Sequence, residues 1–292
     1  MTRGPEASRL RRRKWTERVF TWLMAGSTFL VIGSLLVIIG TIVWKSLPVL
    51  KLSMITQTPK GGYYLGKEGG ILNAIVGSLY LAIGATILAF LFSLPVVLYL
   101  NLYARKNSRI SSLTRFVFDV LWGIPSIVYG AFGFLIMVFF GLRASLLAGI
   151  ITVALLELPI MSRAIDEVMR MIPGELAEAS YSLGATRLET ALKVIVRQCL
   201  PGILTAVLIS FGRGIGDAAS VLFTAGFTDR IPTSLFQPAA TLPLAIFFQL
   251  GSPVAEVQRR AYASAAVLTL IILLISVVSR VLIKRITKHV IK

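Results

Sequence analysis

Two residues of opposite charge, Arg213 and Asp217, lie in a long apolar stretch of the sequence. A charge at the centre of a bilayer costs from about 3 to more than about 10 kcal/mol, so such residues pair or face water. Their i, i+4 spacing places them on one face of a helix, within reach of each other. The pair predicts either a structural salt bridge or a station for an anion, which a guanidinium binds through two parallel hydrogen bonds.

Three glycines, Gly212, Gly214 and Gly216, alternate with these charged residues. Glycine lets a second helix approach closely, and Gly212 and Gly216 form a G-x-x-x-G step. The segment from Gly212 to Asp217 is therefore the candidate substrate path. In that interpretation Arg213 binds the anion, and Asp217 orients Arg213 while the path is empty.

Other polar or helix-bending residues in apolar stretches are secondary candidates. Glu157 and Asp119 lie near the ends of predicted helices, where a long polar side chain reaches the membrane surface. Pro125 and Ser126 belong to the run G-I-P-S-I-V-Y-G, and together with Glu157 they are secondary candidates for the path. Pro125 and Pro159 predict kinks, which are common in membrane helices generally.

The chain has few of the residues that enzymes and metal sites need. It has one Cys and one His, which excludes an internal disulfide and argues against a Cys/His metal cluster. His289 lies three residues from the end of the sequence, a poor place for an active site. The phosphate-binding motif G-x-x-x-x-G-K-[ST] does not occur. We therefore expect no catalytic residues, no metal site and no cofactor bound by this chain.

Composition explains how so apolar a chain can carry so much charge. The 292 residues are 56% hydrophobic and 15% charged, with 30 Lys+Arg against 13 Asp+Glu and a formal charge of +17. A soluble domain has about 25% charged residues. A membrane protein whose basic residues gather on one side resolves the conflict. The basic N-terminal run is better explained as a topology determinant attracted to anionic lipid than as a nucleic-acid site.

The apolar stretches predict six membrane-spanning helices and an all-α fold, because a span needs about 20 mostly apolar residues. A cleavable signal peptide is a poorer interpretation of the first stretch, which is long and has no A-x-A site before Lys45. A further uncharged stretch, 231–255, contains four prolines and is predicted to be broken, re-entrant or interfacial. The six predicted helices are 22–44, 74–98, 117–142, 145–161, 201–225 and 262–282.

The distribution of basic residues predicts the topology. With six spans and both termini cytoplasmic, most of the 30 basic residues fall inside, whereas a seventh span would move the basic C-terminal tail outside. The predicted organisation has a cytoplasmic tail (1–21), a first helix with an outer loop (22–68), a main transmembrane region (69–284) and a second tail (285–292). The main region contains a helical hairpin (163–200) and the Pro-rich segment (229–258).

The predicted hairpin has local signals for a helix, a tight turn and a second helix. Pro173 suits a first helical turn, and Gly184 suits a helix C-terminus that needs positive φ. Thr186 and Glu189 form a T-x-x-E capping box that starts the next helix. Leu176, Ala179 and Leu183 recur at helical spacing. The first helix could insert into a groove on a soluble partner or merely connect two spans.

Several motifs resemble those of one transporter family. The run E-A-S-Y-S-L-G, from Glu178 to Gly184, resembles the E-A-A-x-x-x-G coupling signature of bacterial ABC-importer permeases. The runs L-P-I-M-S-R-A-I-D-E-V-M-R-M-I-P, G-I-P-S-I-V-Y-G and G-R-G-I-G-D-A-A-S-V-L-F-T-A-G resemble the phosphate-specific permeases of the PstA type. This resemblance covers most of the chain, roughly 69–282.

The resemblance implies a type I ABC-importer permease in the bacterial plasma (inner) membrane. The implied partners are a second related permease, two ATPase subunits that use the ATP, an extracytoplasmic phosphate-binding protein and the lipid bilayer. The residues implied to dock the ATPase are Glu178, Ala179, Ser180, Leu183 and Gly184. With the resemblance, Arg213 is favoured as an anion station.

The sequence departs from the family pattern at three places. Ser180 replaces the second Ala of the signature, Arg197 ends the run V-I-V-R where I-x-L-P is usual, and Asp217 stands where the family usually has Glu. Rival interpretations are a permease for sulfate or for molybdate and tungstate, an ion-coupled anion transporter and a membrane-embedded enzyme. A sulfate or molybdate permease would differ only in the anion that it carries. An ion-coupled transporter would not need the hairpin, and an enzyme would need a nucleophile with a base, which this sequence lacks.

Overall fold

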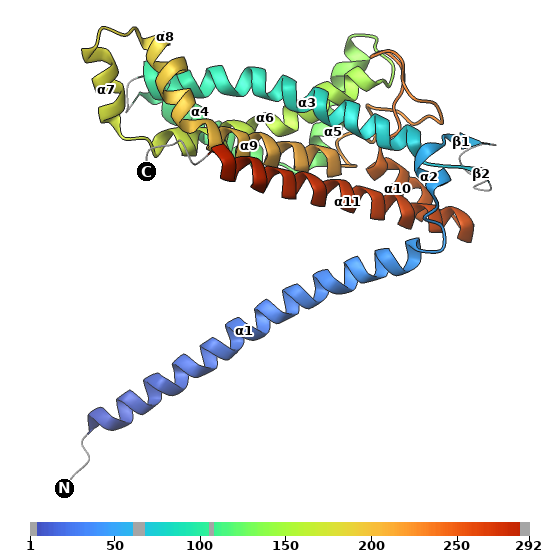
Figure 1. Ribbon diagram of the computed structural model, residues 1–292, viewed down its shortest axis with the longest axis horizontal. Coiled ribbons are helices and arrows are strands. Elements are labelled where there is room, and N and C mark those ends of the chain that lie inside the picture. Colours follow the sequence, from blue (N-terminus) through green and yellow to red (C-terminus); the bar gives the residue numbers. More distant parts are fainter. Residues whose placement is uncertain (1–4, 61–67, 105–107, 287–292) are drawn as a thin grey trace. The chain divides into compact units, whose positions relative to one another are not determined.

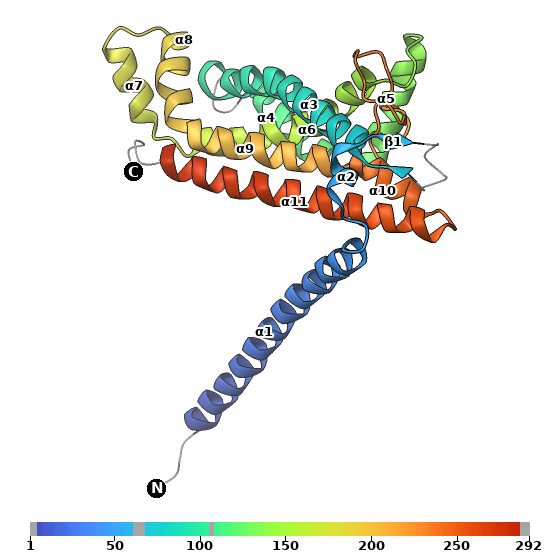
Figure 2. The same cartoon turned by 45° about the vertical axis from the view of Figure 1, so that its right-hand side comes forward.

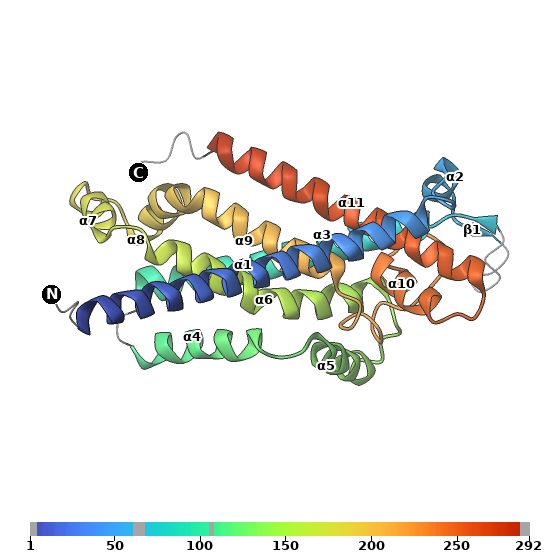
Figure 3. The same cartoon turned by 90° about the horizontal axis from the view of Figure 1, so that it is seen from below.

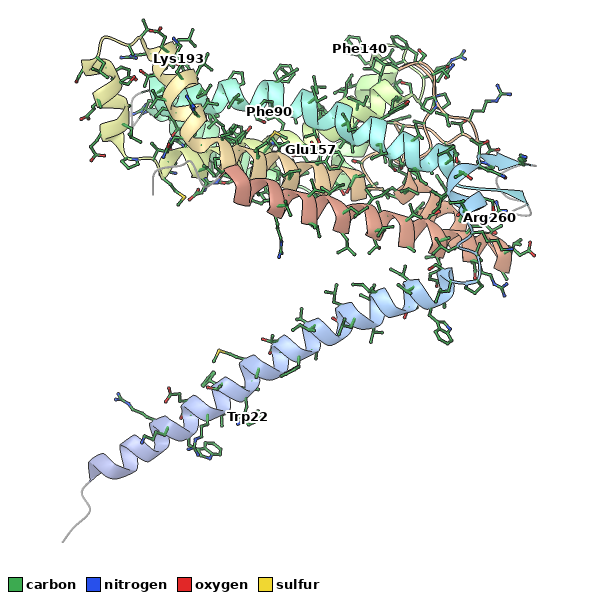
Figure 4. All side chains as sticks on the ribbon, in the orientation of Figure 1. Trp22, Phe90, Phe140, Glu157, Lys193 and Arg260 are labelled. Atoms are coloured by element: carbon green, nitrogen blue, oxygen red, sulfur yellow. The ribbon has the colours of Figure 1, made fainter. Side chains whose placement is uncertain are left out.

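The computed structural model describes residues 5–60, 68–104 and 108–286 (Figure 1). The chain forms two compact units, Met1–Pro48 and Val49–Lys292. The first unit is a single helix, α1 (Pro5–Ser46), of 42 residues. Its most apolar part is long enough to cross a membrane, and Trp22, marked in Figure 4, lies in the first half of the helix. The helix thus starts well before the predicted residue 22, and about 63 Å of helix exceeds the bilayer core.

The second unit is almost entirely helical. A short helix, α2 (Leu52–Thr56), precedes a two-residue antiparallel ribbon of β1 (Pro59–Lys60) and β2 (Glu68–Gly69). The remaining elements are α3 (Leu72–Leu98), η1 (Tyr99–Tyr103), α4 (Arg109–Trp122), α5 (Ser126–Phe139), α6 (Leu146–Arg170), α7 (Gly174–Ser182), α8 (Arg187–Glu189), η2 (Thr190–Ile195), α9 (Val196–Gly216), α10 (Leu242–Leu250) and α11 (Ala255–Ile286).

Six spans are present only if one bent pair of helices counts as a span. Five stretches within the described residues are long and apolar enough to cross a membrane: α1, α3 with η1, α6, α8 to α9, and α11. The predicted third span, 117–142, is wrong as a continuous helix, because α4 and α5 meet at an angle of 103° (Figure 3). The break lies at Gly123–Pro125, where Pro125 lacks an N–H and disfavours the helical conformation of Ile124.

Four other predicted helix boundaries, in three helices, were also wrong. The fourth helix does not end at Met161 but continues to Arg170, and Pro159 lies inside it. The fifth does not begin at Pro201 or reach Ala225, because one helical stretch runs from Arg187 to Gly216. The sixth begins at Ala255, seven residues early. The helices that flank the hairpin are therefore longer than predicted, and the loop between them is shorter.

The core lies where α3, α6 and α9 pack together. Most of the apolar window of α6 is buried, in contrast to α11, which keeps most of its surface exposed. Alanines of α3, including Ala82, Ala85 and Ala89, are fully buried and allow close packing on α6. Figures 1 and 2 show α9 and α11 side by side, with α7 and α8 at one end and α10 toward the other. We call the end that carries α7 and α8 the hairpin end.

The Pro-rich segment is broken, as predicted. Residues 217–241 form turns and bends, and the short helix α10 follows them, with its N-terminus capped by the Thr241 hydroxyl. Buried polar groups fix this segment to α3: Leu242 N donates to Ser78 Oγ at 2.7 Å, and Asn73 Nδ2 donates to the Thr228 carbonyl at 2.7 Å. These bonds hold the two ends of the irregular stretch on α3, whereas its middle, residues 233–238, is exposed.

Candidate functional site: the coupling hairpin and the α9 segment

The turn of the hairpin has the predicted local geometry. Gly184 adopts φ +83°, the left-handed conformation that glycine reaches without steric cost. The capping box is also confirmed: Thr186 N donates to Glu189 Oε2 at 3.1 Å, and Glu189 N donates to Thr186 Oγ1 at 3.3 Å. These two features reverse the chain after α7 and start the next helix at once.

Four of the five predicted docking residues lie on the surface of the hairpin. Glu178, Ala179 and Gly184 are exposed, and the Leu183 side chain is 89% exposed. Ser180 instead faces inward, with its hydroxyl 2.9 Å from Thr190 Oγ1 in a buried hydrogen bond. Ser180 thus joins α7 to η2 within the chain and does not belong to the exposed surface.

The second arm of the hairpin is not the separate helix that was predicted. It runs without interruption from α8 through the π-helical η2 into α9, and Lys193, marked in Figure 4, pairs with Glu189 at 3.2 Å. The first arm is the end of α6, joined to α7 by Met171–Pro173. Both ends of the hairpin therefore lead directly into long helices of the core.

The predicted Arg213–Asp217 pair is wrong in its geometry. The helix ends at Gly216, and Asp217 has an extended backbone (φ −86°, ψ 123°), so the two residues do not share a helical face. Asp217 Oδ2 accepts a hydrogen bond from Ser220 N at 2.8 Å, and the ion pairs found in the described part of the chain do not include Arg213. Asp217 stabilises a turn, whereas Arg213 is exposed.

The three path glycines face different surroundings. Gly214 is buried against α6, whereas a Cβ at Gly212 or Gly216 would meet nothing within 4 Å. Beside Gly212, a groove of about 450 Å³ runs between α9 and α11 and includes Thr205 and Arg280. The G-x-x-x-G face is therefore open within this chain, on the side that also exposes Arg213.

The secondary candidates come closer to the α9 segment than the sequence implied. Ser126 begins α5, and Gly130 of that helix lies so close to the turns after Asp217 that a Cβ there would be 2.7 Å from the Ala219 carbonyl oxygen. Glu157 does not reach the membrane surface, so that prediction was wrong. Its side chain is 0% exposed and packs directly against Gly214.

A buried ionic cluster near the hairpin end was missed by the sequence reasoning. Asp166 of α6 is fully buried and accepts hydrogen bonds from Arg115 Nε at 2.8 Å, Arg115 Nη2 at 3.1 Å and Asn101 Nδ2 at 2.7 Å. Arg163 pairs with Asp119 at 3.1 Å and approaches Asp166 at 3.9 Å. The cluster joins η1, α4 and α6. The only sequence signal was Asp166 between Ile165 and Met169, on what proves to be a buried helical face.

Comparison with known proteins decides the family. Residues 98–292 match the model for the binding-protein-dependent transport system inner membrane component. Two relatives are both called phosphate transport system permease protein PstA. The one from Yersinia pestis is 35% identical over 82% of this chain and 80% of its own length, and that from Haemophilus influenzae is 32% identical over 82% and 84%. The chain belongs to the binding-protein-dependent permeases of the PstA type.

Solved structures agree on the fold of this permease. A chain of the MetNI methionine ABC transporter, in an inward-facing conformation, aligns with a TM-score of 0.59 at 21% identity, covering 74% of this chain and 95% of that one. A chain of a bacterial alginate ABC transporter aligns with a TM-score of 0.62 at 16% identity, covering 94% and 99%. The permease is thus a multi-pass membrane protein with the ABC-importer fold, and a transport component.

Proposed function

We propose that this permease is the membrane subunit of an ATP-driven importer that carries inorganic phosphate into the cell. The observation that carries the proposal is the exposed face of α7 within a signature run, in a chain whose relatives are phosphate permeases. A leucine that is 89% exposed at the tip of a rigid hairpin is an apolar contact that lacks a partner within this chain's described residues. A soluble subunit with a matching groove would cover it.

The partner at the hairpin is an ATPase, because this chain has no phosphate-binding loop with which to use ATP. The whole transporter would contain two such ATPases, a second related permease and a phosphate-binding protein outside the cell. Both termini would be cytoplasmic, which places most of the basic residues on the side of the hairpin. ATPase closure would push α7 and move α6 and α9 together.

Arg213 is the residue proposed to contact the anion. Its guanidinium is exposed on α9, beside Gly212 and Gly216, which leave room for a second helix. A surface of this kind suits a path between two permease subunits, because exposed polar groups in a membrane protein line water-filled routes. Two parallel N–H donors fit a tetrahedral oxyanion. Asp217 does not neutralise the Arg213 guanidinium within this chain. The other contacts of Arg213 would therefore come from the second subunit.

The test uses the whole transporter reconstituted in vesicles with its binding protein and ATP. Arg213→Ala is expected to abolish uptake of phosphate while leaving the complex assembled, and Arg213→Lys to restore only part of it, because an ammonium lacks the two-pronged geometry. Normal phosphate uptake by Arg213→Ala would exclude this residue as the anion contact. Uptake of sulfate or molybdate in place of phosphate would support the rival substrate, and uptake driven by an ion gradient without ATP would support a secondary transporter.

A second measurement tests the docking surface alone. Leu183→Glu should lower co-purification of the ATPase without unfolding the permease, because the side chain is almost fully exposed. Leu52→Glu is the matched control, since Leu52 is 79% exposed on α2, away from the hairpin end. Equal ATPase yield from both variants would contradict docking at α7.

A further inference from the structure

A buried acid lies at the contact between α6 and α9. Glu157 is 0% exposed, and Figure 4 shows it within the bundle, away from the hairpin end marked by Lys193. Neither carboxyl oxygen makes a hydrogen bond with the described residues. The nearest polar group is the Thr86 hydroxyl of α3, which is also buried. Thr86 is therefore the neighbour with which this carboxyl can share a hydrogen bond.

No cation in the described part of the chain compensates a charge on Glu157. On α3 the neighbouring polar group is the uncharged Thr86, and on α9 Arg213 is exposed instead of facing α6. Along α6 itself, Arg163 is engaged by Asp119 and Asp166. A carboxylate that is buried in an apolar interior without a cation is costly enough that the group takes up a proton instead. Protonation also turns the acid into a hydrogen-bond donor, and the Thr86 hydroxyl beside it can accept that bond.

The carboxyl sits directly on the backbone of α9. A Cβ at Gly214 would overlap Glu157 Oε1 and lie 3.0 Å from Val153 Cγ1. A second glycine contact joins the same two helices nearer the hairpin, where a Cβ at Gly202 would overlap Val168. Twelve residues of helix separate Gly202 from Gly214, which is about 18 Å. The two helices that enter and leave the hairpin therefore touch at two points along their length.

We propose that Glu157 is a positioning residue: as a neutral carboxylic acid seated on Gly214, it holds α9 against α6 and keeps the adjacent Arg213 in a fixed relation to the hairpin. The inference deepens the proposed function and rests on it. The geometry has a functional consequence because Gly214 directly follows Arg213. Loss of the contact lets α9 shift on α6, so hairpin movement no longer reaches Arg213 in full. The maximal uptake rate falls, whereas the KM for the loaded binding protein stays unchanged.

The first test is a double-mutant cycle in the assembled transporter. Gly214→Ala places a methyl group where the carboxyl lies and is expected to lower the maximal uptake rate by about tenfold. In Glu157→Ala the space is empty, so adding Gly214→Ala should cost little more. The control is Ser162→Ala, which removes a different buried side-chain oxygen from α6 and should leave uptake near the wild-type rate. If the effects of Gly214→Ala and Glu157→Ala on the maximal uptake rate were additive, the proposed contact between Glu157 and Gly214 would be refuted.

The second test asks whether the acid is neutral. Glu157→Gln preserves size and a hydrogen-bond donor, so uptake should stay within about twofold of wild type. Loss of uptake equal to that of Glu157→Ala would mean that an ionisable group is required and would refute the proposal. Infrared difference spectra of the purified complex, wild type minus Glu157→Gln, should show a protonated carboxyl C=O band at neutral pH, and a carboxylate band in its place would also refute it.

These readouts separate the inference from the proposed function. The infrared band and the thermal unfolding midpoints of the same cycle require no transported anion. If phosphate uptake fails but the band is present and the midpoints are non-additive, the neutral acid and its contact stand and only the substrate is wrong. If uptake is normal but the band is absent and the midpoints add, the positioning role is wrong and the importer stands.

Discussion

The ionic cluster around Asp166 allows the sharpest prediction about the stability of this permease. The carboxylate is fully buried and bound by both Arg115 nitrogens and by the Asn101 amide, at 2.7 to 3.1 Å. Arg115→Ala removes two of these three hydrogen bonds but leaves the charge in place. Two other cations of α6 lie near the carboxylate: Arg163, at 3.9 Å, and Arg170, which acts on it from a greater distance. The substitution therefore leaves a buried charge with one amide donor and no arginine in close hydrogen-bonded contact.

The expected cost can be worked out from this geometry. Removing one partner of a buried ion pair typically costs about 3–5 kcal/mol. Arg115 is 19% exposed, and Arg163 can move toward the carboxylate, so we expect the lower end, about 3 kcal/mol. Asp166→Asn together with Arg115→Ala removes the buried charge as well. That double variant should be more stable than Arg115→Ala alone, which is the opposite of additivity.

The assay is titration of the purified complex with SDS in mixed micelles, with tryptophan fluorescence as the readout of unfolding. Arg109→Ala is the control, since Arg109 starts the same helix, is exposed and should change the free energy of unfolding by less than about 0.5 kcal/mol. A cost for Arg115→Ala no larger than that of Arg109→Ala would refute the reasoning. A double variant that is less stable than both single variants would do the same.

Three further substitutions test single contacts. Gly77→Ala would put a methyl group on the Ala240 carbonyl oxygen and should cost about 1–3 kcal/mol, with faster proteolysis of the 217–241 turns; unchanged proteolysis would contradict the close approach. Gly184→Val has space for its side chain but not the φ of +83°, and should cost about 1–2 kcal/mol and reduce ATPase co-purification; normal yield would show that the turn tolerates the strain. Ser180→Ala should cost about 1 kcal/mol and speed hydrogen exchange of α7, because Thr190 loses its partner; unaltered exchange would argue that other contacts hold the hairpin.

The sequence by itself determined the features that depend on neighbouring residues along the chain. Positive φ at Gly184, the capping box of Thr186 and Glu189, and the break at the Pro-rich segment are set by local dihedral angles and local hydrogen bonds. The apolar stretches likewise indicated the spans, since a window of about 20 residues decides whether a helix can cross a bilayer. The coupling signature indicated an importer permease, and three further runs indicated the PstA type, because each of these motifs is a contiguous stretch of residues.

Helix ends were less well predicted, for a physical reason that is still partly local. Arg213 and Asp217 have the spacing of a helical pair, but the Asp217 carboxylate accepts the Ser220 N–H and the helix stops at Gly216. An aspartate can hydrogen-bond the backbone just ahead of it, so it competes with the helix it would extend. The same residues are compatible with a helix that continues past Asp217 and with a helix that ends at Gly216. In the structure the helix ends at Gly216, and the turns that follow pack against Gly130 of α5.

Only the tertiary structure decided which polar groups are buried and what they touch. Glu157 meets Gly214, 57 residues later in the chain, and Asp166 meets Asn101 and Arg115 from two other elements. Each carboxyl lies on a helix whose sequence would equally suit a solvated end. Whether an acid is paired, protonated or exposed depends on groups brought within a few ångströms by packing. That proximity is a property of the folded chain, and spacing along one helix does not encode it.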